Sequence, residues 1–242
     1  MTTAKTTQAH RGFRFPDPPE RKPEEMTSFD HLSTTGSTHH LIKHLGNTDT
    51  TLVAGEHYIS PTLTRNMAGV KFPDLLIAFD VDPAAYYRRN AYVISEQGKP
   101  PDFVLEIASR ATGREDTGEK RDAYAALGIP EYWRFDKTGE YHGVRLAGDL
   151  LVGGVYEPIP IERVSEDIWQ GYSAVLDLSI RWHDGQLEWY DPATGRHIVT
   201  FDDERARADD ERDRADDERT ARLRAEARVR ELEAELRQMR GH

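Results

Sequence analysis

The segment that most constrains the fold is residues 103–108, which reads Phe-Val-Leu-Glu-Ile-Ala and follows the rigid pair Pro100-Pro101. Its apolar side chains occupy both odd and even positions, as expected of a strand that is covered on both faces. Residues 75–79, Leu-Leu-Ile-Ala-Phe, form a second apolar strand candidate. A chain with such strands needs further layers packed against its sheet.

Other segments show the punctuation of helices and hairpins. Helical candidates lie at residues 39–45 and 83–90, and further strand candidates at residues 92–94 and 132–135. Two hairpins are expected downstream, one in residues 150–156 folded at Gly153-Gly154 and one in residues 180–189 folded at Asp184-Gly185. This order predicts a mixed α/β core with an antiparallel hairpin extension.

A helix is expected at residues 117–127. Asp116 can cap its first turn while Glu119 reaches back, as in a capping box. Gly128 then ends the helix and Pro130 prevents it from resuming. The inward stripe of this helix should contain Tyr124, and Lys120 lies on the same face because it precedes Tyr124 by four residues.

Three regions differ in composition. Residues 1–27 hold four prolines among charged residues and are expected to be a poorly ordered leader. Residues 28–200 hold nearly all the large apolar side chains and must form the folded domain. Residues 201–242 form a charged tail, and from Asp202 to Arg240 this tail contains no Gly and no Pro, which predicts one long solvated helix.

The tail also contains a heptad repeat whose last two heptads offer an apolar seam. That seam comprises Ala225, Val229, Leu232, Leu236 and Met239. A terminal coiled coil that forms a homodimer is one interpretation. The other is a single helix held by neighbouring opposite charges.

Charge and composition limit the classes of function. The formal net charge is −11, which argues against broad electrostatic adhesion to nucleic acid or anionic lipid. Residues 201–242 hold 11 Arg and 14 Asp or Glu, a net of −3, so residues 1–200 carry the remaining −8. Any chain of this composition that acts on nucleic acid therefore needs a local basic patch or a bridging metal.

The absent residue types and motifs are also informative. No cysteine occurs, which excludes disulfides, thiolate nucleophiles and Cys-ligated metal sites. Neither a signal segment nor an apolar run of bilayer length is present, so we expect a cytoplasmic protein without a membrane partner. No Gly-rich phosphate loop appears, and no small-molecule cofactor is expected.

Three charged residues stand where burial is expected. Glu106 interrupts the apolar strand, where an ionised carboxylate is costly unless it is paired or bound to a metal. Lys120 lies on an inward helix face, and Asp74 begins the other apolar strand, directly after Pro73. A structural ion pair between Glu106 and Lys120 is one interpretation. The favoured one is a site for phosphodiester hydrolysis. In it, two carboxylates hold a hard cation, and the lysine orients the attacking water or stabilises charge on the phosphate.

An ordered series of motifs resembles the Uma-type restriction endonuclease family of the PD-(D/E)XK superfamily. The series consists of Pro73-Asp74-Leu75-Leu76-Ile77, Pro101-Asp102-Phe103-Val104-Leu105-Glu106-Ile107-Ala108-Ser109, Asp116-x-x-x-Lys120-x-x-x-Tyr124 and Gly128-Ile129-Pro130-Glu131-Tyr132-Trp133. One departure concerns the superfamily's usual lysine position, two residues after the glutamate, which is Ala108 here. The lysine role therefore passes to Lys120 on the following helix.

The resemblance implies a restriction-endonuclease-like fold and metal-dependent hydrolysis of DNA. It assigns Asp74, Glu106 and Lys120 to catalysis and implies that Asp74, Glu106 and the backbone of Ile107 hold Mg²⁺, with Mn²⁺ as a substitute. The alternative from another functional class is a non-catalytic interaction protein, in which the nuclease-like core is a platform and the coiled-coil tail recruits partners. The acidic body favours this alternative, and the three retained residues favour the enzyme.

Overall fold

The computed structural model describes residues 12–18, 38–109 and 116–198, together with residues 207, 210–212, 214–215, 217–226, 228–229 and 232 of the tail. The chain divides into two compact units, Met1–Ile198 and Val199–His242. Within the described residues, no helix is both long enough and apolar enough to cross a membrane.

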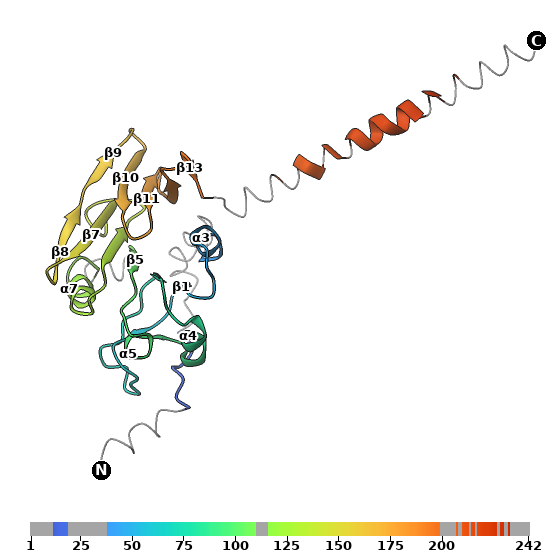
Figure 1. Cartoon of the computed structure of the whole chain (residues 1–242). Coiled ribbons are helices and arrows are strands. Elements are labelled where there is room, and N and C mark those ends of the chain that lie inside the picture. The colour runs from blue at the N-terminus through green and yellow to red at the C-terminus, as the bar shows by residue number, and fades with distance from the viewer. Residues whose placement is uncertain are drawn as a thin grey trace, which may run out of the picture. The chain divides into compact units, whose positions relative to one another are not determined.

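A six-stranded mixed sheet with the strand order β1-β3-β5-β6-β7-β8 forms the centre of the first unit (Figure 1). Its neighbouring strands are antiparallel except β5 and β6, which are parallel and are connected through α7 (Glu119–Ala126). A parallel pair requires such a crossover, because the chain must return to the starting end of the sheet. The strands are β1 (Leu52–Gly55), β3 (Leu75–Ala78), β5 (Phe103–Ile107), β6 (Glu131–Phe135), β7 (Leu146–Val152) and β8 (Val155–Ile159).

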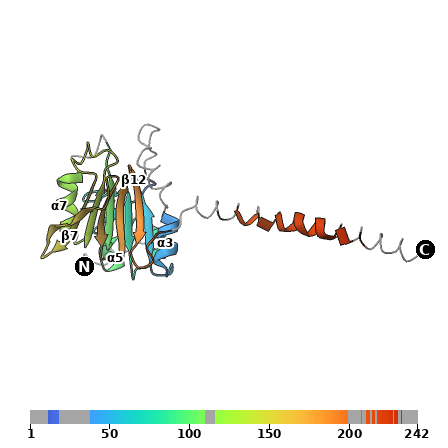
Figure 2. The ribbon, with the colours of Figure 1, turned by 90° about the horizontal axis from the view of Figure 1, so that it is seen from above.

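A second sheet of five antiparallel strands, ordered β13-β12-β11-β10-β9, packs on one face of the first. Figure 2 shows the strands from above, with α7 and α3 (Thr38–Leu45) on opposite sides of the domain. The shared core contains Leu75, Leu105 and Trp133 from the first sheet and Ile180 and Trp189 from the second. The strands are β9 (Ile161–Arg163), β10 (Ile168–Ser173), β11 (Leu178–His183), β12 (Gln186–Asp191) and β13 (Arg196–His197).

The opposite face of the six-stranded sheet packs against α7 and against a small layer that precedes β5 in the chain. Its core includes Leu76, Val104, Tyr124 and Tyr132. The small layer holds the parallel pair β2–β4 and two short helices, with bounds β2 (Ile59–Ser60), β4 (Tyr92–Val93), α4 (Pro83–Arg89) and α5 (Ile94–Gln97). The mixed α/β fold is therefore confirmed, and β5 is covered on both faces, as its apolar pattern predicts.

Both expected hairpins form, but they belong to different sheets. Gly153 and Gly154 have φ of 59° and 87° and connect β7 to β8, which extends the central sheet. Asp184 and Gly185 have φ of 47° and 81° and connect β11 to β12 in the second sheet. Two consecutive residues with positive φ match the twist of the flanking strands. The extension expected from the sequence is thus in large part a separate layer that covers the core.

Trp133 fills the space between the two sheets because two glycines leave room for its ring. A Cβ on Gly148 would lie 2.9 Å from the Trp133 ring, and one on Gly171 would lie 2.8 Å from it. The indole Nε1 donates to Glu131 Oε2 at 2.8 Å, and that oxygen also accepts from Ser173 Oγ at 2.6 Å. Glu131 on β6 and Ser173 on β10 therefore join the sheets through a buried carboxylate.

Part of the expected leader is packed against the folded domain. Phe15 is 1 % exposed, and its backbone N–H donates to the carbonyl of Arg89 at 2.8 Å. The expectation of a poorly ordered segment thus fails for residues 12–18, because Phe13 and Phe15 find an apolar surface around Tyr58 and Val93. The remaining residues of the expected leader lie outside the described residues.

Within the second unit, residues 217–226 are helical and exposed. Arg222 donates to Glu226 at 2.9 Å, the spacing expected of a helix held by charge pairs. Leu223, Val229 and Leu232 are exposed, and Leu236 and Met239 lie outside the described residues. The continuous helix over residues 202–240 and the coiled coil remain predictions.

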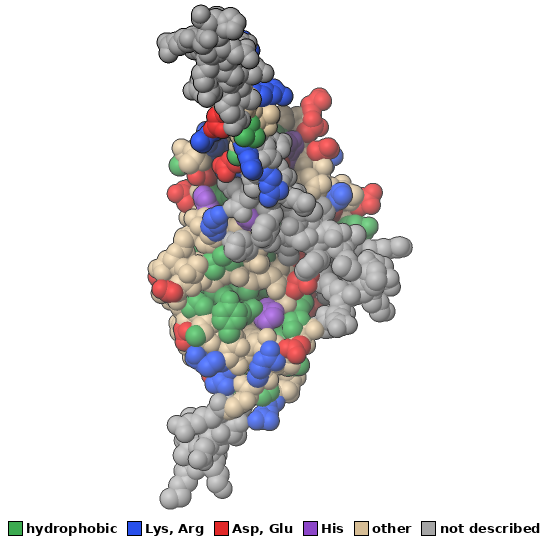
Figure 3. Space-filling view, turned by 90° about the vertical axis from the view of Figure 1, so that its right-hand side faces the viewer, with side chains coloured by type: hydrophobic (Ala, Val, Ile, Leu, Met, Phe, Trp, Pro, Cys, Tyr) green, Lys and Arg blue, Asp and Glu red, His purple; other side chains and the backbone are tan. Residues whose placement is uncertain are grey.

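The surface of the first unit mixes opposite charges. On the face shown in Figure 3, Lys and Arg side chains are scattered among Asp and Glu, and hydrophobic side chains gather around a histidine near its middle. The basic side chains drawn there do not form one continuous patch. A partner with many phosphates therefore has no broad cationic surface on that face of the described domain.

Candidate active site

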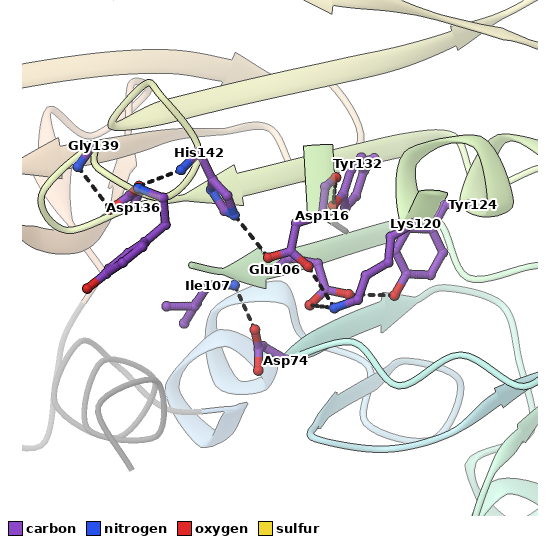
Figure 4. Close-up of polar contacts among 11 residues, drawn as sticks. Asp74, Glu106, Ile107, Asp116, Lys120, Tyr124, Tyr132, Asp136, Gly139 and His142 are labelled. Carbon is purple, nitrogen blue, oxygen red and sulfur yellow. Dashed lines mark hydrogen bonds and ion pairs between the residues drawn. The ribbon is translucent and has the colours of Figure 1, made fainter. Parts of the chain in front are cut away.

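Two neighbouring strands bring Asp74 and Glu106 together. In the antiparallel pairing of β3 and β5, Leu75 lies opposite Leu105 and Leu76 opposite Val104. One further pair in this register places Asp74 opposite Glu106, and opposite residues share a face of the sheet. Asp74 Oδ2 accepts from the backbone N–H of Ile107 at 2.6 Å (Figure 4).

Lys120 and Tyr124 reach Glu106 from α7. The ammonium of Lys120 donates to Glu106 Oε2 at 2.9 Å, and the hydroxyl of Tyr124 donates to Glu106 Oε1 at 2.6 Å (Figure 4). The spacing of four residues places both side chains on the helix face that covers the sheet, as expected from the sequence. Glu106 is 2 % exposed, so these two donors replace most of its contact with water.

Asp116 also belongs to this cluster, which corrects its expected role as a helix cap. The N-cap residue of α7 is Gly118, not Asp116, and it makes no side-chain cap hydrogen bond. Asp116 is fully buried, and its Oδ1 lies 2.7 Å from the Nζ of Lys120. Its backbone carbonyl accepts from Tyr132 at 2.8 Å. Asp116 therefore pairs with the charge of Lys120 inside the cluster.

His142 contacts Asp116 from the loop between β6 and β7. Its Nε2 lies 3.0 Å from Asp116 Oδ2, and its side chain is 1 % exposed. Asp136 shapes this loop, because its carboxylate accepts backbone N–H groups from Thr138, Gly139, Tyr141 and His142 at 2.7–3.1 Å. These four bonds hold the loop in one conformation and so fix where His142 enters the site.

The site carries more negative than positive charge, which perturbs its proton affinities. Burial, together with the charges of Asp74 and Asp116, raises the pKa of Glu106 to about 8 despite the opposing effect of Lys120. Burial opposes the charge on Lys120, but Glu106 and Asp116 reverse this and raise its pKa. Burial also opposes the charge of Asp116, but His142 and Lys120 lower its pKa overall.

Tyr124 remains a hydrogen-bond donor under these conditions. Burial and the nearby Glu106 raise the pKa of its hydroxyl well above the ordinary value. The proton on Tyr124 therefore stays available to Glu106 Oε1 at neutral pH. Together the donors orient both oxygens of Glu106, so that this carboxylate has one defined position between Lys120 and Tyr124.

The sequence-predicted residues Asp74, Glu106, Ile107 and Lys120 thus lie at one end of β3 and β5, with α7 covering them. The described residues contain no group of at least three His, Cys, Asp or Glu side chains that could hold a metal ion. Metal binding here would rest on the two carboxylates and the Ile107 backbone. Sequence reasoning missed His142 and misassigned Asp116. The signal for Asp116 was its position four residues before Lys120, whereas no local pattern marked His142.

The family of the chain follows from a comparison with protein-family models. Residues 33–182 match the model of the Uma2 family, described as "Putative restriction endonuclease". Among solved structures, the chain is similar to that of a putative nuclease from Anabaena variabilis, with a TM-score of 0.37 and 10% sequence identity over 61% of this chain and 75% of that one. No functionally curated protein matches the chain. Because the family model covers more than half of the sequence, the chain belongs to the Uma2 family of restriction-endonuclease-like proteins.

Proposed function

We propose that this protein is a divalent-metal-dependent endonuclease that hydrolyses DNA phosphodiester bonds with Asp74, Glu106 and Lys120. The observation that carries the proposal is their convergence from three separate segments. Lys120 Nζ lies 2.9 Å from Glu106 Oε2, and the β3–β5 register sets Asp74 opposite Glu106. Two carboxylates and an amine in one buried cluster suit phosphodiester hydrolysis.

The residues present fit a hard cation such as Mg²⁺, with Mn²⁺ as a substitute. The raised pKa of Glu106 reflects its burial first, and then the charges of Asp74 and Asp116, which one ammonium does not fully offset. Mg²⁺ binds through one or two carboxylates, keeping water and substrate phosphate as its other ligands, so a third acidic side chain is not required. Asp74, Glu106 and the carbonyl of Ile107 would hold it. A bound cation would polarise the scissile phosphate and neutralise charge that develops on it.

The chain's own side chains would prepare the site for the reaction. The hydrogen bond from the Ile107 N–H fixes Asp74, and Tyr124 fixes Glu106 Oε1. Lys120 keeps its proton because two carboxylates stabilise the ammonium. Its remaining N–H can orient the attacking water or donate to a phosphate oxygen, since an ammonium has three donors. Asp116 Oδ1, 2.7 Å from the Nζ of Lys120, would help to hold the ammonium in this position.

A cleavage assay separates this function from a purely structural ion pair. Plasmid and linear DNA would be incubated with the full chain in Mg²⁺ or Mn²⁺, with EDTA as the metal-free arm. Lys120→Met should lower the cleavage rate by about 100-fold or more, the scale on which a single charge-stabilising donor acts. Lys99→Met is the matched control, because Lys99 also pairs with a carboxylate, Asp102 Oδ2 at 2.7 Å, outside the site.

The outcomes discriminate between the enzyme and the interaction platform. Metal-dependent cleavage that is lost in Lys120→Met and kept in Lys99→Met supports the enzyme. Cleavage that survives in both variants would come from a contaminant or from other residues and would refute the assignment. A folded wild type that cleaves none of these substrates with either metal would favour the alternative, a nuclease-like platform that binds partners.

A further inference from the structure

A cavity of about 680 Å³ is lined by residues that are neighbours, in sequence or in the sheet, of residues of the candidate active site. Two links join the cavity and the site. Arg134 lines the cavity and lies opposite Glu106 in the parallel register of β5 and β6. Arg121 also lines the cavity and directly follows Lys120 on α7. The cavity and the carboxylates therefore share α7 and the same ends of the parallel strands.

The cavity has an excess of positive charge. Its charged lining residues are Arg121, Arg134, Arg145 and Asp149. Asp149, 2 % exposed, accepts from Arg121 at 2.9 Å and from Arg134 at 2.7 Å. Arg145 is exposed, and its guanidinium lies 4.1 Å from the ring centre of Trp182. The lining thus holds one carboxylate and three guanidinium groups, and Arg145 has no acidic partner in the described part of the chain.

The unsatisfied polar groups of the lining are donors. The Nε of Arg134 and the Nε1 of Trp169 are buried and have no hydrogen-bond partner in the part of the chain that the structure describes. Buried donors without acceptors are uncommon in native structures and lower stability. An anionic ligand with several acceptor oxygens would supply what these groups lack after small side-chain movements. A cationic or donor-rich ligand would not.

The loop between β6 and β7 couples the cavity to the site. Asp136 anchors it through four backbone N–H groups, His142 enters the site at Asp116, and the following residues Gly143, Val144 and Arg145 line the cavity. A ligand phosphate in the cavity would therefore be held at a fixed separation from the carboxylates. Such positioning is what a substrate strand requires next to its scissile bond.

We propose that this cavity, the arginine pocket, binds a phosphate of the substrate strand next to the phosphodiester that is cleaved. The proposal rests on the proposed nuclease function and names the contact that holds its substrate. The pocket supplies a local basic site of the kind that a nuclease with this acidic composition needs. Arginine suits this role because its planar guanidinium binds phosphate oxygens through two parallel hydrogen bonds. A free phosphate or a mononucleotide offers the same chemistry.

The test is DNA binding by the full chain in EDTA, where cleavage cannot obscure it. Fluorescence anisotropy with a labelled duplex would give the Kd at several salt concentrations. Arg145→Gln should lower the slope of log affinity against log salt by about 0.9, the value for one lost phosphate contact on duplex DNA. Arg145→Lys should keep most of the slope, because it retains the charge. The control is Arg88→Gln, an exposed arginine on α4 paired only with the exposed Asp82.

A second arm distinguishes the source of the phosphate. Inorganic phosphate and a mononucleotide would be tested for thermal stabilisation of the wild type and of Arg145→Gln. A reduced slope in Arg145→Gln with an unchanged slope in Arg88→Gln supports the substrate contact. Equal slopes in both variants overturn it, and stabilisation by free phosphate without any slope change assigns the pocket to a small ligand instead. The catalytic assignment is tested separately, because Lys120→Met should lose cleavage while its DNA binding is unchanged. A failure of the pocket therefore appears in the binding of Arg145→Gln, and a failure of the catalytic assignment appears in the cleavage by Lys120→Met.

Discussion

Nε2 of His142 lies 3.0 Å from Oδ2 of Asp116, and neither side chain is more than 1 % exposed. The contact joins the β6–β7 loop to the segment before α7, which are 26 residues apart in sequence. Asp116 in turn holds Lys120, so His142 acts on the candidate active site through two intermediate side chains. It is therefore a positioning residue.

The first prediction concerns the energetic coupling of this pair. His142→Ala and Asp116→Asn should each destabilise the protein, and the double variant should cost less than their sum by about 0.5–3 kcal/mol, as for residues in one buried network. Urea unfolding of the four proteins measures this coupling. His183→Ala is the control, because His183 is 41% exposed and pairs with Glu188 instead. Additive effects of His142→Ala and Asp116→Asn would show that the contact is energetically silent.

The second prediction concerns the pH dependence of stability without metal. The pKa of Glu106 rises from 4.5 to about 8 on folding, chiefly through burial, so the folded state binds this proton more tightly than the unfolded state. The resulting stability is fully present below about pH 4.5 and is lost as the pH rises through about 8. The loss is on the order of a few kcal/mol, at about 1.4 kcal/mol for each pKa unit.

Glu106→Gln tests this prediction because glutamine keeps the shape of the side chain but does not titrate. In EDTA, the urea midpoint should fall between about pH 5 and about pH 9, and the fall should be larger in the wild type than in Glu106→Gln. The difference between the two proteins isolates Glu106 from the other titrating groups. Parallel pH profiles would mean that Glu106 stays ionised in the folded protein.

The third prediction concerns metal binding. Mg²⁺ or Mn²⁺ should raise the melting temperature of the wild type, and a metal at 100 times its Kd contributes about 2.7 kcal/mol. Asp74→Asn should remove most of this effect while the fold persists, because asparagine can still accept the Ile107 N–H. The effect in the wild type should grow between about pH 6 and about pH 8, because the metal requires Glu106 to lose its proton.

Asp80→Asn is the matched control for the metal experiment. Asp80 follows the same strand, is exposed, and has a φ of 55°, a conformation that asparagine tolerates. It removes one charge without touching the site. An equal thermal shift in Asp74→Asn and Asp80→Asn would place the metal elsewhere.

The fourth prediction concerns the packing of Trp133. Gly148→Ala adds a methyl group 2.9 Å from the Trp133 ring, and such overpacking should cost about 1–3 kcal/mol in unfolding free energy. In a Trp133→Phe background the added methyl should cost less, since the smaller ring leaves room. Urea unfolding of the four proteins measures both costs. An unchanged cost in that background would show that the strain is in the β7 backbone.

The fifth prediction separates the two units. Truncation after Thr200 should leave the first unit folded with its metal response intact, because that unit ends at Ile198. If the tail forms the proposed homodimer, light scattering should give the mass of a dimer for the full chain and that of a monomer for the truncated chain. An unchanged mass would leave the tail as a single helix. If the truncated chain is unfolded, the domain boundary assumed here is wrong.

The sequence alone determined the elements that have local causes. The apolar segment that contains Glu106, the paired residues of the two hairpin turns and the glycine that ends α7 all act through neighbours in the chain. These features predicted the strands, the turns and the inward face that Lys120 shares with Tyr124. The ordered motifs, rather than any one of them, indicated the family.

Only the tertiary structure decided which distant groups meet. The β3–β5 register set Asp74 against Glu106, and the folding of the β6–β7 loop brought His142 to Asp116. The five-stranded antiparallel sheet packs on the mixed six-stranded sheet, so that much of the extension expected from the sequence is a separate layer. Local patterns report helix and strand periodicity, whereas contacts between remote segments depend on register and on how layers stack. For that reason the two carboxylates and the lysine could be proposed from the sequence, but the histidine and the arginine pocket could not.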